Sequence, residues 1–203
     1  SAVLPFAMPK AEAATSFKDI GASHRAYEEI MYLSEGEIVH GSNGNYKPNA
    51  SLSRAEAMAM IGRALNLNGT QRVTKFKDVG INNFASGYIQ SAVDAKIVSG
   101  YGDGTFKPNG DVTRGEMAVM ISKAFGYDFG NTASGAAKAL LSRGIAQGLK
   151  DGTFGSSLKL TRGDFAVFLA RAINHKLRVK STVTYGSVMY VNATSLNVRS
   201  GPN

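Results

Sequence analysis

The chain has 203 residues, no cysteine and a formal net charge of +8. That length suits one large or two modest domains, the 43% hydrophobic content excludes wholesale disorder, and the missing cysteines exclude a disulfide framework, a cysteine zinc site and a thiol nucleophile. Residues 131–203 hold ten basic and only two acidic side chains, so the positive excess lies in the last third and favours an anionic partner.

The first segment, residues 1–13, is a short apolar run that ends in Ala11-Glu12-Ala13. This ending fits the small-x-small cleavage pattern of a signal peptide, and the charged start of such a peptide is missing. We therefore expect a signal-peptide remnant and an exported protein; the alternative is an Ala-rich N-terminus without a targeting role. No stretch approaches the roughly 18 apolar residues of a membrane span, so we expect no membrane insertion.

Three copies of one pattern follow, at residues 14–70, 71–130 and 131–177. The first two open with the same motif, Phe17-Lys18-Asp19-Ile20 and Phe76-Lys77-Asp78-Val79. In every copy an aromatic residue stands eight positions before an arginine. These pairs are Tyr46 and Arg54, Phe106 and Arg114, and Phe154 and Arg162. Two motifs at fixed spacing in three copies indicate an internal repeat.

Each copy is predicted to form a helix, a Gly-rich loop and a second helix. The first helices are expected over about Ala26–Leu33, Phe84–Lys96 and Ser134–Arg143. After each arginine, apolar residues recur at i, i+3, i+4, i+7 and i+8, as Ala57, Met60, Ile61, Ala64 and Leu65 do in the first copy. A two-helix unit cannot bury its own apolar face, but three units around a shared axis can. The predicted fold is mainly α, with three tandem helix–loop–helix repeats in a pseudo-threefold arrangement around a central helical bundle.

The residue before each arginine is a predicted N-cap, and an acidic residue at N3 completes a capping box. The caps are Ser53, Thr113 and Thr161, and the acids are Glu56, Glu116 and the shorter, weaker Asp164. These residues are expected to stabilise the helix starts, and that role alone explains them.

The arginines need another explanation, because a cation at N1 lies beside the positive end of the helix dipole. One interpretation is an anion site: free N–H groups at the helix start, together with a forked guanidinium, suit a carboxylate. The other is structural, with each arginine paired to Asp19 or Asp78. The two interpretations are compatible, because an aspartate can orient an arginine that binds a ligand.

The glycine-rich loop at Gly100–Thr105 lacks the Gly-Lys-Ser/Thr of a phosphate loop and the spaced acids of an EF-hand. Tight turns or close backbone approach to a ligand remain as its alternative roles. The three histidines, His24, His40 and His175, have no metal-ligand spacing, and no catalytic constellation is present. We expect no metal, no cofactor and no enzymatic activity in this chain.

Together, Phe-x-Asp-Ile/Val, the Gly-x-x-Asp-Gly-Thr-Phe-Lys-Pro-Asn loop and Thr-Arg-Gly-Glu resemble the S-layer homology (SLH) domain, with three tandem copies over about residues 14–177. The resemblance implies binding to a pyruvylated secondary cell wall polysaccharide linked to peptidoglycan, with the motif arginine on the pyruvyl carboxylate in grooves between copies. Carried over, the site residues are Arg54, Arg114 and Arg162 with their caps Ser53, Thr113 and Thr161, and, as groove-shaping residues, Asp19, Asp78, Gly41, Gly100 and Gly148.

The third copy departs from this pattern. It lacks the Phe-x-Asp opening and has Gly155-Ser156 in place of Lys-Pro, so its groove is expected to be altered or inactive. Residues 178–203 are expected to be a linker and a truncated start of another module, because Leu196–Pro202 is similar to the opening of bacterial SH3-like domains. The alternative is a basic tail without its own fold.

The expected function is non-covalent anchoring of an exported protein to the bacterial cell wall, by a monomer with internal pseudo-threefold symmetry at the surface of a Gram-positive-type envelope. The alternative is the targeting region of a larger peptidoglycan hydrolase whose catalytic domain lies outside this chain. Nucleic-acid binding is disfavoured, because aromatic residues are not interleaved with the basic ones.

Overall fold

The computed structural model describes residues 16–180, 182–185 and 188–191. Six α-helices, two to each copy, dominate this part of the chain and confirm a mainly helical fold. They are α1 Tyr27–Glu35, α2 Arg54–Ala64, α3 Ser86–Asp94, α4 Arg114–Phe125, α5 Ala133–Ser142 and α6 Arg162–Ile173. A 3₁₀ helix, η1 His175–Leu177, follows α6, and β1 Thr182–Tyr185 pairs antiparallel with β2 Val188–Val191, Thr182 opposite Val191. The predicted signal-peptide remnant and the SH3-like element at Leu196–Pro202 lie outside the described residues.

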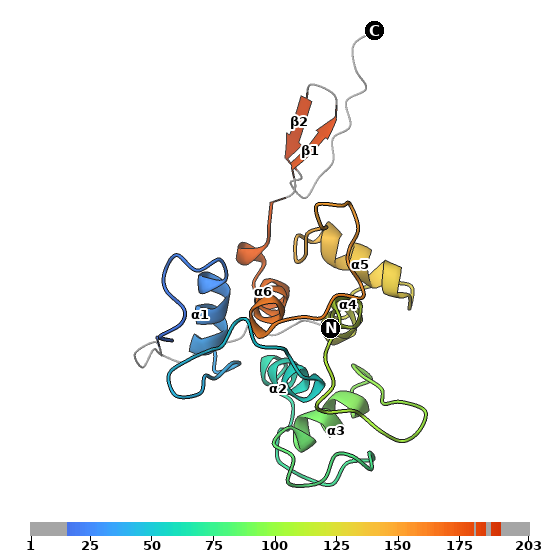
Figure 1. Ribbon diagram of the computed structural model, residues 1–203. Helices are drawn as coiled ribbons and strands as arrows, with labels where there is room; N and C mark the ends of the chain where they lie inside the picture. Colours follow the sequence, from blue (N-terminus) through green and yellow to red (C-terminus); the bar gives the residue numbers. More distant parts are fainter. Residues whose placement is uncertain (1–15, 181, 186–187, 192–203) are drawn as a thin grey trace.

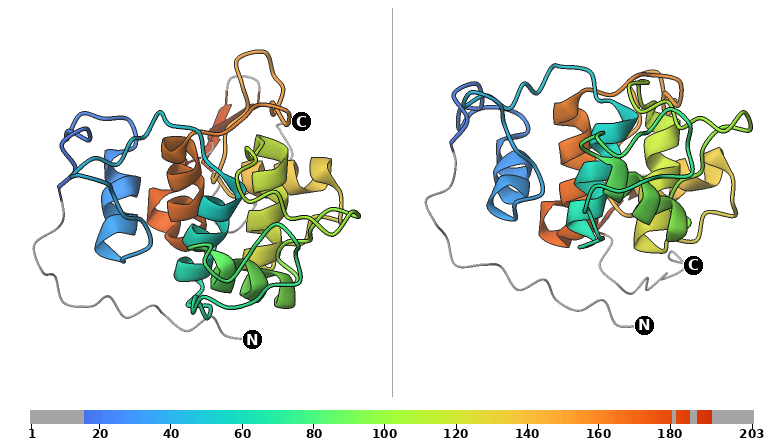
Figure 2. Two further views of the ribbon diagram at one scale, coloured as in Figure 1. Left: turned by 60° about the horizontal axis from the view of Figure 1, so that its bottom comes forward. Right: turned by 90° about the horizontal axis from the view of Figure 1, so that it is seen from below.

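The second helices of the three copies form the centre of the molecule. In Figures 1 and 2, α2, α4 and α6 lie side by side, with α1, α3 and α5 around them. The predicted apolar stripes face this centre, where the equivalent Ile61, Ile121 and Leu169 are completely buried. The stripes therefore form one shared core, as expected for repeats that cannot bury an apolar face alone.

The outer helices cover the central ones in a cyclic order. Helix α3 packs on α2, α5 packs on α4, and α1 packs on α6. The first helix of each copy thus covers the second helix of the preceding copy, and α1 closes the ring on the last copy. The contact between α1 and α6 includes an ion pair, in which Arg171 Nη2 lies 3.2 Å from Glu29 Oε1. This order of contacts is the one expected for the predicted pseudo-threefold arrangement.

The residues that precede the three central helices meet at one end of the molecule. The Leu52 amide donates to the Leu160 carbonyl at 3.2 Å, and the Leu160 amide donates to the Val112 carbonyl at 2.9 Å. All three side chains are buried. The N-termini of α2, α4 and α6 therefore gather at this end, which is where the predicted site residues lie.

The third copy continues past η1. Arg178 Nε donates to the Arg171 carbonyl at 2.9 Å, and Arg178 Nη2 donates to the Tyr127 hydroxyl at 3.2 Å. The Val179 amide donates to the Gly144 carbonyl at 2.9 Å. Arg178 and Val179, which the sequence assigned to the linker, are thus held against the second and third copies.

Candidate functional site

The predicted N-caps are present at all three central helices. Ser53 and Thr113 form complete capping boxes with Glu56 and Glu116. Thr161 accepts a hydrogen bond from the Asp164 amide at 3.1 Å, while the Asp164 carboxylate pairs with Arg25 at 2.7 Å. The prediction that Asp164 closes its box less well is confirmed.

The arginine that follows each cap reaches into the loop of the next copy. Its Nε donates to the carbonyl of that loop's aromatic residue, from Arg54 to Phe106 at 2.9 Å, from Arg114 to Phe154 at 2.9 Å and from Arg162 to Tyr46 at 3.0 Å. In each case the guanidinium carbon lies 4.7 Å from the centre of the same ring, within the range of a cation–π interaction. Every copy thus supplies one arginine and receives another, so both motifs of the repeat take part in the same contact between neighbouring copies.

Asp19 and Asp78 do not pair with these arginines, so the alternative interpretation of the arginines as partners of these aspartates is wrong. The Asp19 carboxylate accepts from the amides of Tyr46 and Lys47 at 2.8 and 2.7 Å. Asp78 accepts from Phe106 and Lys107 at 2.8 Å each. Desolvation raises the pKa of both carboxyls, but these backbone amides outweigh it and hold each pKa below 3.8. The aspartates therefore fix the loop whose carbonyl receives the arginine.

The loop of the third copy, which diverges in sequence, forms the same turn as the loops of the first two copies but without a bond to an aspartate. Lys47 and Lys107 have positive φ, at 60° and 58°, and their amides are held by the aspartates. Gly155 occupies the equivalent place with φ 70°. A glycine adopts this conformation without steric cost, so the third copy forms the turn without an aspartate.

The loop glycines Gly41 and Gly100 lie under the phenylalanines that open their copies. A Cβ at Gly41 would overlap the Phe17 ring, and one at Gly100 would overlap the Phe76 ring. Gly148, in the copy that has no such phenylalanine, has room for a side chain. Packing against the phenylalanines accounts for the two crowded glycines, and none of the three lines the two cavities described next.

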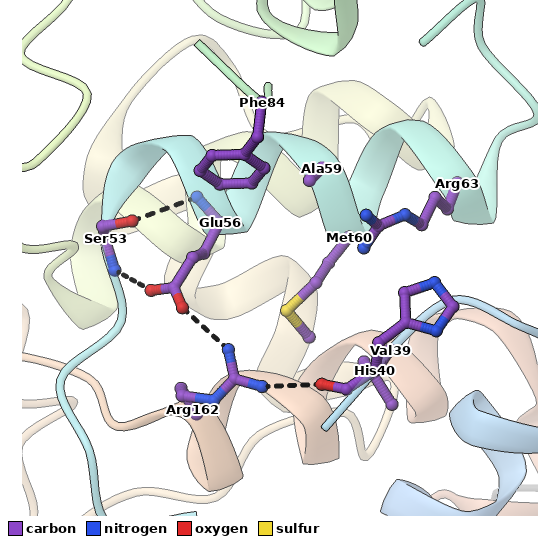
Figure 3. Close-up of a pocket in the computed structure, with 9 residues that line it drawn as sticks. All are labelled: Val39, His40, Ser53, Glu56, Ala59, Met60, Arg63, Phe84 and Arg162. Atoms are coloured by element: carbon purple, nitrogen blue, oxygen red, sulfur yellow. Dashed lines mark hydrogen bonds and ion pairs between the residues drawn. The ribbon is translucent and has the colours of Figure 1, made fainter. Parts of the chain in front are cut away.

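A cavity of about 310 Å³ lies between α2 and Arg162, and we call it the Arg162 groove. All three copies build it, because α2 and the preceding loop come from the first, Phe84 from the second and Arg162 from the third (Figure 3). Its lining residues are Val39, His40, Ser53, Glu56, Ala59, Met60, Arg63, Phe84 and Arg162.

Two arginines and one glutamate give this groove a surplus positive charge. Arg162 Nη1 pairs with Glu56 Oε1 at 2.8 Å, and Arg162 Nη2 donates to the His40 carbonyl at 3.2 Å (Figure 3). Arg63, from the last turn of α2, lies beside the His40 imidazole. Burial and the neighbouring Arg63 lower the pKa of His40, which favours the neutral imidazole near pH 7. The charge that Glu56 does not neutralise suits a monoanion such as one carboxylate.

A second cavity, of about 260 Å³, is the repeat equivalent of the first, and we call it the Arg54 groove. Arg54 lies 3.9 Å from Glu116, and Lys123 takes the place of Arg63, so two cations again oppose one carboxylate. The Arg54 side chain is only 7% exposed, because the Tyr101 ring lies over it in addition to Phe106. Lys123 is exposed and is therefore the more accessible cation of this groove.

At the corresponding surface around Arg114, which we call the Arg114 groove, Arg114 donates to the carbonyls of Phe154 and Gln147, and the two charged residues equivalent to Glu56 and Arg63 are in ion pairs with other residues of the protein. Asp164 pairs with Arg25, and Arg171 pairs with the buried Glu29. Phe168 stands where the other grooves have a methionine, 5.1 Å from the Arg114 guanidinium. The sequence predicted an altered groove at the third copy without identifying the arginine that faces it; in the structure the loop and α6 of the third copy face Arg114 of the second copy.

Arg63 and Lys123 were missed by the sequence reasoning. A basic residue stands nine positions after each motif arginine, as Arg63, Lys123 and Arg171. Cations are common in the last turn of helices, so this regularity by itself does not distinguish a site from a helix end.

Within residues 16–180 and the two strands, no helix has the length and apolar character that crossing a bilayer requires. The same part of the chain holds no group of three or more His, Asp or Glu side chains placed to bind a metal ion.

Comparison with known proteins gives relatives of several kinds. The chain is 36% identical over 119 residues to an S-layer protein of Bacillus licheniformis, covering 58% of the chain and 14% of that protein. It is 34% identical over 112 residues to an endoglucanase of Bacillus sp. (strain KSM-635), covering 55% of the chain and 12% of that protein. It is 30% identical over 115 residues to a cellulosome-anchoring protein of Acetivibrio thermocellus, covering 54% of the chain and 26% of that protein.

The chain thus corresponds to a small part of each relative's length. The model of the S-layer homology domain matches it three times, at residues 16–58, 75–118 and 128–166. These matches cover most of the helical repeats and identify a cell-wall-associated protein of the extracellular surface. The chain belongs to the S-layer homology domain family and carries three tandem copies of that domain.

Proposed function

We propose that this chain anchors an exported protein to the bacterial cell wall by binding a pyruvylated secondary cell wall polysaccharide that is linked to peptidoglycan. The observation that carries the proposal is the pair of equivalent cavities, each with two cations against one carboxylate along a central helix. A pyruvate ketal supplies one carboxylate on each modified sugar, which matches the one surplus charge of each groove.

In this proposal the two cations of each groove have different roles. Arg162 and Arg54 organise the groove walls through their bonds to the next copy and offer their remaining N–H groups to the ligand. Arg63 and the exposed Lys123 supply the second positive charge of the Arg162 groove and the Arg54 groove, respectively. Because each groove alone binds weakly, two grooves on one polymer raise the overall affinity through avidity.

Binding to purified cell wall, before and after chemical removal of pyruvate, tests the proposal. We expect the chain to sediment with untreated wall and to stay in solution with depyruvylated wall. Neutral dextran particles control for trapping. Equal binding to both wall preparations would contradict the carboxylate mechanism.

A second candidate is the targeting region of a larger hydrolase, including a peptidoglycan hydrolase that continues into an SH3-like module. The observation that favours it is the match to part of an endoglucanase. In this case too, the three copies act as the anchor and are not themselves catalytic. A turbidity assay on peptidoglycan separates the roles, because lysis by this chain alone would contradict a non-catalytic anchor.

A further inference from the structure

Phe84 is an exposed aromatic residue at the edge of the Arg162 groove. Its side chain is 52% exposed, although Phe is usually among the more buried residue types. The other exposed large apolar residues of the described chain, namely Val73, Ile81, Tyr101 and Leu158, do not line either described cavity. An exposed ring beside a charged cavity calls for an explanation other than core packing.

The position of the ring relative to the charges is informative. In Figure 3, Phe84 stands over the first turn of α2 beside Glu56, while the Arg63 guanidinium lies at the other end of the cavity. The groove thus has a cationic end and an apolar wall. A ligand that fills both would carry an anionic group and a flat apolar face, joined within about 310 Å³.

We infer that Phe84 is the stacking residue of the Arg162 groove and receives the apolar face of the sugar ring that carries the carboxylate. The inference rests on the proposed function and adds its sugar-recognising part. A pyranose presents axial C–H groups on one face, and these pack on an aromatic ring as other apolar groups do. The charged end binds the carboxylate, and the ring selects the sugar to which the carboxylate is attached.

The inference also distinguishes the grooves from one another. At the corresponding edge of the Arg54 groove the lining residue is Ala133, which offers no ring. Tyr101 lies near Arg54, but the Lys107 ammonium is 4.0 Å from its ring centre and the Arg54 guanidinium is 5.1 Å away. The Arg162 groove is therefore the principal sugar site of the chain, and the Arg54 groove is the weaker one.

Calorimetric titration of the whole chain with a pyruvylated monosaccharide tests this assignment. Phe84→Ala is expected to lower the affinity about five- to tenfold, Phe84→Leu to lower it less, and Phe84→Trp to retain it. Val73→Ala, which removes a side chain that is 75% exposed and outside both cavities, is the control and should leave the affinity unchanged. Because the chain has no tryptophan, Phe84→Trp also introduces a single fluorophore whose emission should change as the sugar binds.

The possible results distinguish a failure of the stacking role of Phe84 from a failure of the proposed function on which that role rests. If the parent chain binds the sugar and Phe84→Ala binds it equally well, Phe84 is not a stacking residue. If the parent chain does not bind the sugar at all, the proposed function fails and the inference fails with it. Titration with pyruvate alone provides a second comparison, because an anion without a sugar ring should bind the parent and Phe84→Ala equally. Weaker pyruvate binding by Phe84→Ala would show a general disturbance of the groove and would overturn the stacking role.

Discussion

At the scale of single residues, each motif arginine has a structural role as well as a place in a groove or its equivalent. Arg162 donates to two carbonyls of the first copy and pairs with Glu56, while its side chain is only 15% exposed. A guanidinium held in this way is preorganised for a carboxylate, but its removal also disturbs the fold. Loss of binding in an arginine variant therefore has to be separated from loss of stability.

The variants Arg162→Gln and Lys123→Gln make this separation. Arg162→Gln leaves Glu56 unpaired and two carbonyls without their donor, so we expect a loss of about 2–4 kcal/mol in the free energy of unfolding, measured with urea. Lys123→Gln removes an exposed charge and should weaken sugar binding in the Arg54 groove several-fold while the melting temperature stays unchanged. Lys138→Gln on α5, outside both cavities, is the matched charge control. If Lys123→Gln binds as well as Lys138→Gln, the surplus charge of the groove is not used.

Acid sensitivity is a second property of single residues. The pKa values of Asp19 and Asp78 lie below 3.8 in the folded chain, so the native state binds their protons more weakly than the unfolded state does. Their contribution is therefore complete at neutral pH and is lost as the pH falls through the folded pKa values. Asp103 and Asp151, whose pKa values are lowered by hydrogen bonds from Thr105 and Thr153, add to this loss.

We expect Asp19→Asn and Asp78→Asn to be less stable than the parent at pH 7 and to lose less stability between about pH 5 and pH 2. Chemical denaturation at a series of pH values measures this. Asp94→Asn on α3 is a control away from the loops. A variant whose stability falls with acid as steeply as that of the parent would rule out the loop amides as the cause.

At the scale of helices, the sequence was sufficient to predict the two helices of each copy, the three caps and the weak closing role of Asp164. These features are local, because a cap and an apolar period depend on residues within a few positions of one another. The sequence did not predict which helix covers which. An apolar stripe specifies that a face is buried but not its partner, so the packing of α1 on α6 and of α3 on α2 required the structure.

The sequence did not predict which residues the arginines contact either, because a local motif does not specify its partner in another copy. The motif arginine and the loop aromatic lie eight positions apart in one copy, yet each contacts its counterpart in a neighbouring copy. One of the two interpretations of the arginines paired Asp19 with an arginine, and Asp19 instead binds the loop amides of Tyr46 and Lys47. Gly155 was interpreted as divergence, although it retains the backbone conformation of Lys47 and Lys107.

Variants of the N-caps test the stability of the central helices separately from sugar binding. Ser53→Ala and Thr113→Ala each remove the oxygen that accepts the N3 amide, and each should cost about 1 kcal/mol of stability. Only Ser53 lines a described cavity, so Thr113→Ala should leave sugar affinity unchanged. Thermal unfolding and calorimetry measure the two effects. A loss of binding in Thr113→Ala without unfolding would show that this cap contacts ligand directly.

At the scale of the whole molecule, the ring of repeats is closed by α1 on α6, and the Glu29–Arg171 pair lies in that contact. The side chains are 9% and 18% exposed, so removing one partner leaves a nearly buried charge. We expect Arg171→Met to cost about 3–5 kcal/mol and the double variant Glu29→Gln with Arg171→Met to recover part of that loss. Urea unfolding of both variants measures the difference. Equal stability of the single and double variants would show that the pair does not hold the ring together.

The central claim is that the grooves recognise a carboxylate attached to a sugar. Isothermal titration of the intact chain with a pyruvylated monosaccharide, alongside the same sugar without pyruvate, tests it most directly. The account predicts salt-sensitive binding of the pyruvylated sugar at no more than two sites per chain, the stronger lost in Arg63→Gln with Phe84→Ala, and no measurable binding of the neutral sugar. Equal affinity for the two sugars, or two-site binding that is unchanged in both Arg54→Ala and Arg162→Ala, would contradict the account.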